Sequence, residues 1–157
     1  MMQTGRWAMA GLSLVLLACG GGDATTDSAT VDSAAASADA MATPATANVS
    51  MMAVDNSGVT AEVTLTAAGE QTTVGMHLTG APANAALPAH IHSGTCENKG
   101  PAVAPLDSVK TDATGMGMIN TTISVPFATV NNGQHFVQAH LPTGTPAACG
   151  NIPAKMM

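Results

Sequence analysis

Metal binding is the first chemistry that the sequence suggests, because its histidines are clustered. His90 and His92 are separated by one residue. On a β-strand, residues two apart point to the same face, so both imidazoles would lie outside while Ile91 enters the core. His140 lies on the polar face of a later apolar segment. Three imidazoles with solvent suit Cu(II), Cu(I) or Zn(II), although a His-x-His pair on an exposed strand is often only solvated.

Further histidines and two methionines could extend this site. His77 is predicted to lie on the outer face of a neighbouring strand and is the favoured fourth ligand. His135 is five residues before His140, so a bulge would be needed to turn it to the same face, and we expect it to be solvated. Met116 and Met118 place two thioethers, which select Cu(I), on one strand face. Alternatively, Met fills the core of a chain with 2% aromatic residues.

The first residues indicate export. Arg6 precedes an apolar stretch over residues 7–17, which is too short for a membrane-spanning helix of about 20 residues. The stretch ends in Leu-x-Ala-Cys, the pattern of a lipobox. We therefore interpret residues 1–18 as a lipoprotein signal peptide and Cys19 as the lipidated N-terminus that anchors the chain. The alternative is an ordinary secretory signal with a chance Cys. Gly20 after the Cys favours the outer membrane.

Residues 19–47 contain Ala, Ser, Thr, Asp and Gly with hardly a large apolar side chain, so they cannot offset their ordering entropy. We interpret them as a flexible tether and residues 48–157 as the folded domain. With Cys19 lipidated, Cys96 and Cys149 remain as an even pair. An oxidising exported compartment permits a disulfide between them. Two free thiols or a metal-thiolate site are the alternatives.

The composition excludes several classes of function. The 157 residues suffice for one domain, and Lys and Arg together number four. Such a chain has no cationic stripe for nucleic acid. With 16 Gly and 9 Pro, a coiled coil is excluded and a helical bundle disfavoured.

The histidines must be positioned by strands. Residues 59–66 and 72–79 alternate between apolar and polar side chains, and shorter apolar segments follow at 88–92, 116–125 and 136–141. Gly and Pro interrupt the gaps, and no convincing helical period is present. Several short strands with frequent turns predict an all-β sandwich or barrel.

The same segments resemble the Cu/Zn superoxide dismutase family, in matching order over residues 59–152. Five segments carry the resemblance. They are the strand before the family's His-x-His (73–80), the His-x-His strand (87–96), the Cys followed by Gly-Pro (96–101), the late copper-ligand strand (136–140) and the closing Ala-Cys-Gly-x-Ile (147–152). The chordin-type (CHRD) domain is also similar, through its His-Ile-His-x-Gly segment and closing Val-x-x-His strand.

Either resemblance implies a Greek-key β-sandwich or flattened eight-strand barrel. The dismutase resemblance implies that His90, His92 and His140 are copper ligands and that Cys96 and Cys149 form the intramolecular disulfide. It also implies an enzyme in which superoxide alternately reduces and reoxidises copper, giving O₂ and H₂O₂.

Departures from the dismutase pattern imply a low activity. Ala102 stands where the family has the His that bridges copper and zinc, and no His and Asp cluster follows, so zinc is not supported. Pro146 stands where the family has an Arg that guides superoxide, and the loop over residues 141–148 is short. Without Arg6 the net charge is −7, from three Lys and ten acidic residues, and Lys99 is the only cation near the proposed site.

We therefore expect an exported, lipid-anchored envelope protein that faces the periplasm or the surface. It would hold one copper ion and dismutate superoxide with reduced efficiency. The alternative is a non-catalytic CHRD-like binding or copper-holding module.

Overall fold

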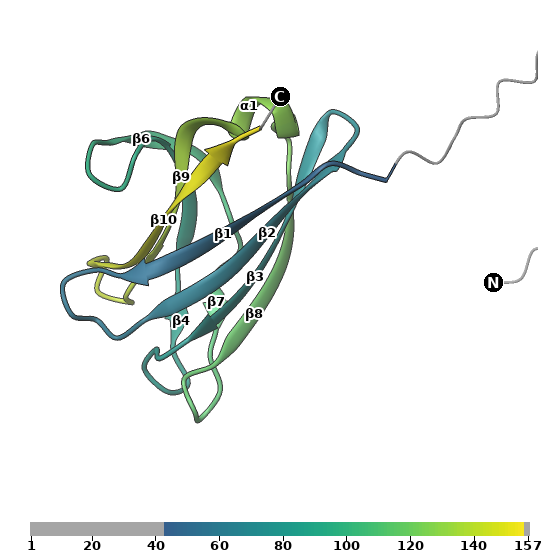
Figure 1. The fold of residues 1–157 in the computed structure, drawn as a ribbon. Coiled ribbons are helices and arrows are strands. Elements are labelled where there is room, and N and C mark those ends of the chain that lie inside the picture. The colour runs from purple at the N-terminus through teal and green to yellow at the C-terminus, as the bar shows by residue number, and fades with distance from the viewer. Residues whose placement is uncertain (1–42, 156–157) are drawn as a thin grey trace, which may run out of the picture. The chain divides into compact units, whose positions relative to one another are not determined.

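The computed structural model describes residues 43–155, which form an all-β domain (Figure 1). The lipobox, Cys19 and residues 19–42 of the expected tether lie outside the described residues. The elements are β1 (Thr46–Ala53), β2 (Thr60–Ala68), β3 (Gln71–Thr79), β4 (Ala86–Leu87), β5 (Ala89–Gly94), β6 (Lys99–Pro105), β7 (Val109–Lys110), β8 (Gly117–Ile123), α1 (Phe127–Val130), β9 (Asn132–His140) and β10 (Pro146–Ala154). β1 begins at Thr46, ahead of the expected domain start at residue 48.

One antiparallel sheet of eight strands makes up the domain, in the order β6-β5-β9-β10-β1-β2-β3-β8, and β4 and β7 form a small second sheet. β1 joins the two halves of the large sheet, because it pairs with β2 up to Met51 and with β10 from Met52. The sheet curls so that both halves line one core, with β6 and β8 as its edges (Figure 1). The Greek-key all-β fold predicted from the sequence is confirmed. It takes the form of a curled sheet whose edge strands, β6 and β8, do not pair with each other.

Alternation correctly identifies the strands that lie against the core on one face. Val59, Ala61, Val63 and Leu65 are at most 4% exposed, while the Thr and Glu side chains between them are exposed. β3 behaves in the same way, with Val74, Met76 and Leu78 buried and His77 exposed, and β5, β8 and β9 occupy the other predicted segments.

Three strands of the large sheet lack that simple signal. β6 carries Pro101 and Pro105, which a strand tolerates at a sheet edge because the missing N–H groups need no partner there. In β10, residues 147–150 are buried in succession, because one face packs on the core and the disulfide covers the other. β1 buries only Ala47, Val49 and Met51, between Asn and Ser, and so continues the small-residue composition of the predicted tether.

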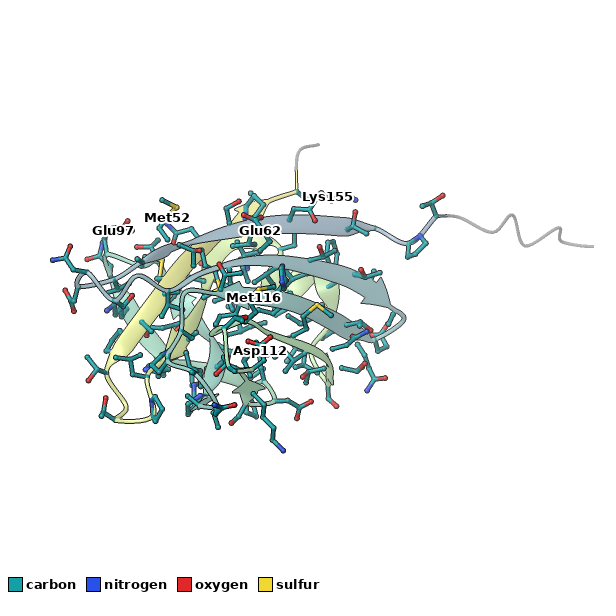
Figure 2. The ribbon with its side chains drawn as sticks, turned by 90° about the horizontal axis from the view of Figure 1, so that it is seen from below. Met52, Glu62, Glu97, Asp112, Met116 and Lys155 are labelled. Carbon is teal, nitrogen blue, oxygen red and sulfur yellow. A yellow bond between two sulfur atoms is a disulfide. The ribbon has the colours of Figure 1, made fainter. Side chains whose placement is uncertain are left out.

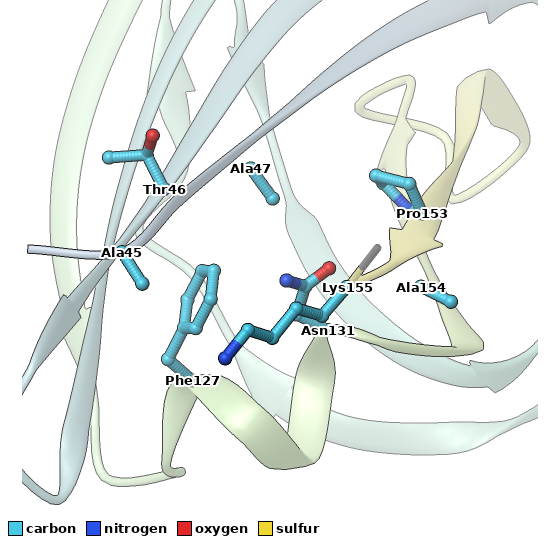
Figure 3. Close-up of a pocket in the computed structure, with 8 residues that line it drawn as sticks. All are labelled: Ala45, Thr46, Ala47, Phe127, Asn131, Pro153, Ala154 and Lys155. Carbon is cyan, nitrogen blue, oxygen red and sulfur yellow. The ribbon is translucent and has the colours of Figure 1, made fainter. Parts of the chain in front are cut away.

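A single helical turn, α1, closes one end of the core. Phe127 and Asn131 border a hollow of about 410 Å³ that Lys155 also lines (Figure 3). The side-chain oxygen of Asn131 is buried there without a hydrogen-bond partner. Among residues 43–155, no helix has the length and apolar character needed to cross a bilayer.

The predicted disulfide between Cys96 and Cys149 is present and ties the turn between β5 and β6 to β10, with a Cα–Cα distance of 5.9 Å. The backbone N–H of Cys96 also donates to the side-chain oxygen of Asn151, at 2.8 Å. Together these contacts hold the turn against the outer face of β10.

Replacing both cysteines with Ala is expected to lower the free energy of unfolding by about 4 kcal/mol, because the bond closes a loop of 53 residues. Urea unfolding of the oxidised protein and the double variant measures this difference. Reductant should destabilise the unaltered protein and leave the double variant unchanged. A difference below about 1 kcal/mol would show that the bond does not restrict the unfolded chain as the entropy model requires.

Candidate metal centre

The pairing of β5 with β9 brings the three histidines together. Ala89 pairs with Ala139 and Ile91 with Val137, and all four side chains are fully buried in the core. Because directly opposed residues share a face of the sheet, His90 and His92 must lie on its outer side.

His140 ends β9 on the same outer side, and its backbone N–H donates to the carbonyl oxygen of Pro88, at 2.8 Å. This bond places His140 beside the start of the His90 strand. The ring centroid of His90 lies 5.8 Å from that of His92 and 5.6 Å from that of His140. The centroids of His92 and His140 are 6.3 Å apart. One nitrogen from each ring lies within 4.8 Å of the others. The predicted convergence of these three side chains is confirmed.

The arrangement fits one metal ion with an open coordination position. Two imidazole nitrogens on one ion, with metal–nitrogen bonds of about 2.0–2.1 Å, are separated by at most about 4 Å, so small ring rotations suffice to close the triad. Three protein ligands leave room for solvent or a substrate, as in catalytic metal sites. The rings are partly buried, which limits access to one side.

Backbone carbonyls fix which nitrogen of two of the rings can bind a metal. Nδ1 of His92 lies 3.1 Å from the carbonyl oxygen of Gly100, and Nδ1 of His140 lies 3.2 Å from that of Gly144. A carbonyl only accepts, so each Nδ1 carries the proton and each Nε2 presents a lone pair. Nε2 of His92 is buried without a hydrogen-bond partner, so its lone pair is free to bind a metal ion.

The surroundings of His90 favour the neutral form of its imidazole. Burial lowers the pKa of His90, and repulsion from His140 and then His92 lowers it further. The imidazole is therefore neutral at pH 7, which is the form that binds metal. Because its pKa is lowered, protonation of His90, which opposes metal binding, begins at a lower pH than in a free imidazole, whose pKa is about 6.5.

A small buried layer, separate from the main core, lies beneath the site. The ring of Phe136 is fully buried and stacks on His92, at 5.1 Å and 18°. Gln138 is directly opposite His90 and is 3% exposed, and its side-chain nitrogen has no hydrogen-bond partner. Gln138 thus brings an unused donor to the face that carries the three histidines. Neither residue is predicted from the sequence as part of the site, although their even spacing from His140 places them on its face of the strand.

The other histidines lie elsewhere. His77 pairs with Glu62 of β2 and Met118 of β8 in the other half of the sheet, so it does not join the triad as the predicted fourth ligand. Nδ1 of His135 lies 3.0 Å from the side-chain oxygen of Asn132, and burial lowers its pKa. As expected, His135 is not part of the triad.

The Gly100 carbonyl offers a test of how the site is organised. A Cβ on Gly100 would lie 2.7 Å from the backbone oxygen of Ser93, so Gly100→Ala must displace this segment from His92. We expect Cu(II) affinity to fall by about tenfold or more with all three ligands intact. Competition titration measures this loss. Gly75→Ala is the matched control, because its Cβ would approach only the Thr64 oxygen, at 3.9 Å. Equal affinity of the two variants would rule out the orienting role.

No family model matches the chain, and no curated protein matches it. Among solved structures, the chain is similar to a double mutant of a SOD-like protein from Bacillus subtilis, with 12% identity, a TM-score of 0.49, and coverage of 68% of this chain and 97% of that one.

Proposed function

We propose that this domain binds one copper ion through His90, His92 and His140 and dismutates superoxide slowly. The observation that carries the proposal is the convergence of three imidazoles, each of which brings one ring nitrogen to within 4.8 Å of the others. Copper supplies one-electron redox chemistry when it is bound, and the net reaction converts two superoxide anions and two protons into O₂ and H₂O₂. Imidazole ligands suit copper in both oxidation states.

The chain's own residues explain why the rate should be low. Ala102 pairs directly with His92, and Pro146 pairs directly with His140. These are the positions of the bridging His and the guiding Arg in the dismutase resemblance. Two sides of the triad therefore lack the groups that would move protons and attract an anion.

The charge distribution supports the same conclusion. Within residues 43–155 the cations are Lys99, Lys110 and Lys155. Lys110 and Lys155 line other hollows, and Lys99 lies at the far end of the hairpin, opposite Gly94. An acidic protein without a local positive funnel repels superoxide and associates with it slowly.

We also propose that Cys19 carries lipid, so that the domain acts at the cell envelope, on the outer membrane, facing the periplasm or the surface. The lipobox pattern before Cys19 supports this proposal. Intact-mass spectrometry tests it, since an unmodified Cys19 in protein from the native membrane would refute it.

A dismutation assay with and without copper tests the catalytic proposal. We expect copper-dependent activity well below the diffusion limit of about 10⁹ M⁻¹s⁻¹. Pro146→Arg should raise the rate, and high salt should reduce that gain because steering is screened.

His140→Ala should abolish the activity, whereas His135→Ala, outside the triad, should retain it. A near-diffusion-limited rate would contradict the proposed defect, and activity that is independent of copper would contradict the proposed site.

The second candidate is a non-catalytic copper-holding module. The missing cation beside His140 favours it, since the triad needs no substrate-guiding group merely to hold an ion. Stoichiometric copper binding with no copper-dependent dismutation, in the unaltered protein and in Pro146→Arg, would select this function.

A further inference from the structure

We propose that the outer face of β3 and β8 carries a second, Cu(I)-selective site, formed by the imidazole of His77 and the thioethers of Met116 and Met118. This site is independent of the histidine triad and of the proposed dismutation. The inference goes beyond that function, and either can fail alone.

The sheet register places an imidazole beside a thioether. His77 and Met118 are directly paired across β3 and β8. Their neighbours Met76 and Leu78 are buried, so the pair lies on the outer face. Opposed residues on one face have Cβ atoms about 4.5–5.5 Å apart, which lets both side chains reach a common ion.

Met116 supplies the second sulfur from the turn that enters β8. It lines the same hollow of about 490 Å³ as His77 and Met118. Two backbone contacts fix its position, because its N–H donates to the Asp112 carboxylate at 3.1 Å and its carbonyl accepts from the Asp112 N–H at 2.8 Å. Thr114 also donates to Asp112, from both its backbone N–H and its hydroxyl. Figure 2 shows Met116 and Asp112 near each other.

Packing does not account for these methionines. Met118 is 72% exposed and Met116 is 44% exposed, and they are two of the four large apolar side chains that residues 43–155 expose. A methionine used as core filler would be buried, as Met51 and Met76 are. Two exposed thioethers around one imidazole are instead a donor set that ligand softness directs to Cu(I).

The charges around the hollow suit a monovalent cation. Asp112 and Lys110 both line it, and Glu62 lies across β3 as the other partner of His77. The hydroxyl of Ser50 donates to the Glu62 carboxylate, at 3.0 Å. Because the proposed site offers one nitrogen and two thioether sulfur donors and no oxygen ligand, Zn²⁺ and Ca²⁺ should bind weakly here.

Titration of the full chain with Ag(I), a redox-inert stand-in for Cu(I), tests this site. With ¹³C-methyl-labelled methionine, we expect the Met116 and Met118 signals to shift together and saturate at one equivalent. The Met52 signal should stay unchanged, although this side chain is 68% exposed. Equal shifts at all three methionines, or none, would overturn the proposal.

Affinity measurements complete the test. In competition with a chromogenic Cu(I) chelator, Met118→Leu should weaken binding by about tenfold or more, the scale on which changes at metal sites act. Met52→Leu is the matched control. His90→Ala should retain Cu(I) binding at this second site, because His77 and Met118 belong to strands other than that of His90. Binding that is lost in His90→Ala but kept in Met118→Leu would assign all the copper to the triad.

Discussion

The register of β5 against β9 is the constraint on which the site depends. Side chains alternate along a strand, so a slip of one residue would send His90 and His92 into the core and bring Ile91 to solvent. The buried pairs Ala89–Ala139 and Ile91–Val137 make that slip costly, because apolar surface would become exposed and imidazoles buried. The energy that folds this half of the sheet is thus the same energy that assembles the triad.

A second layer of contacts converts this placement into a defined set of donor atoms. The disulfide holds the turn after β5 against β10, and the Gly100 carbonyl that follows fixes the His92 tautomer. The short turn after β9 does the same for His140 through Gly144. These contacts orient the histidines, and no Lys or Arg lies in the loop over residues 141–145 beside His140.

Strand alternation made much of this predictable. β2, β3, β5, β8 and β9 follow their apolar period, and the His-x-His spacing correctly places two imidazoles on one face. β6 and β10 were not predicted, because neither shows an apolar period. β6 contains Pro residues, and β10 is buried on both faces. The sequence predicts the outer face of His77 correctly, because faces can be read from one strand. Its expected place as a possible fourth ligand fails, because the neighbours of a strand depend on long-range pairing. Gln138 shares the face of His140 by its even spacing, whereas its burial opposite His90 depends on the pairing of β9 with β5.

Titration of the oxidised protein with Cu(II), followed by electron paramagnetic resonance, tests directly whether the three histidines bind copper. We expect one tight equivalent with an axial, nitrogen-rich signal that disappears in His90→Ala and persists in His77→Ala. An absent saturable signal, or one that His90→Ala leaves unchanged, would contradict the assignment of the triad as a copper site.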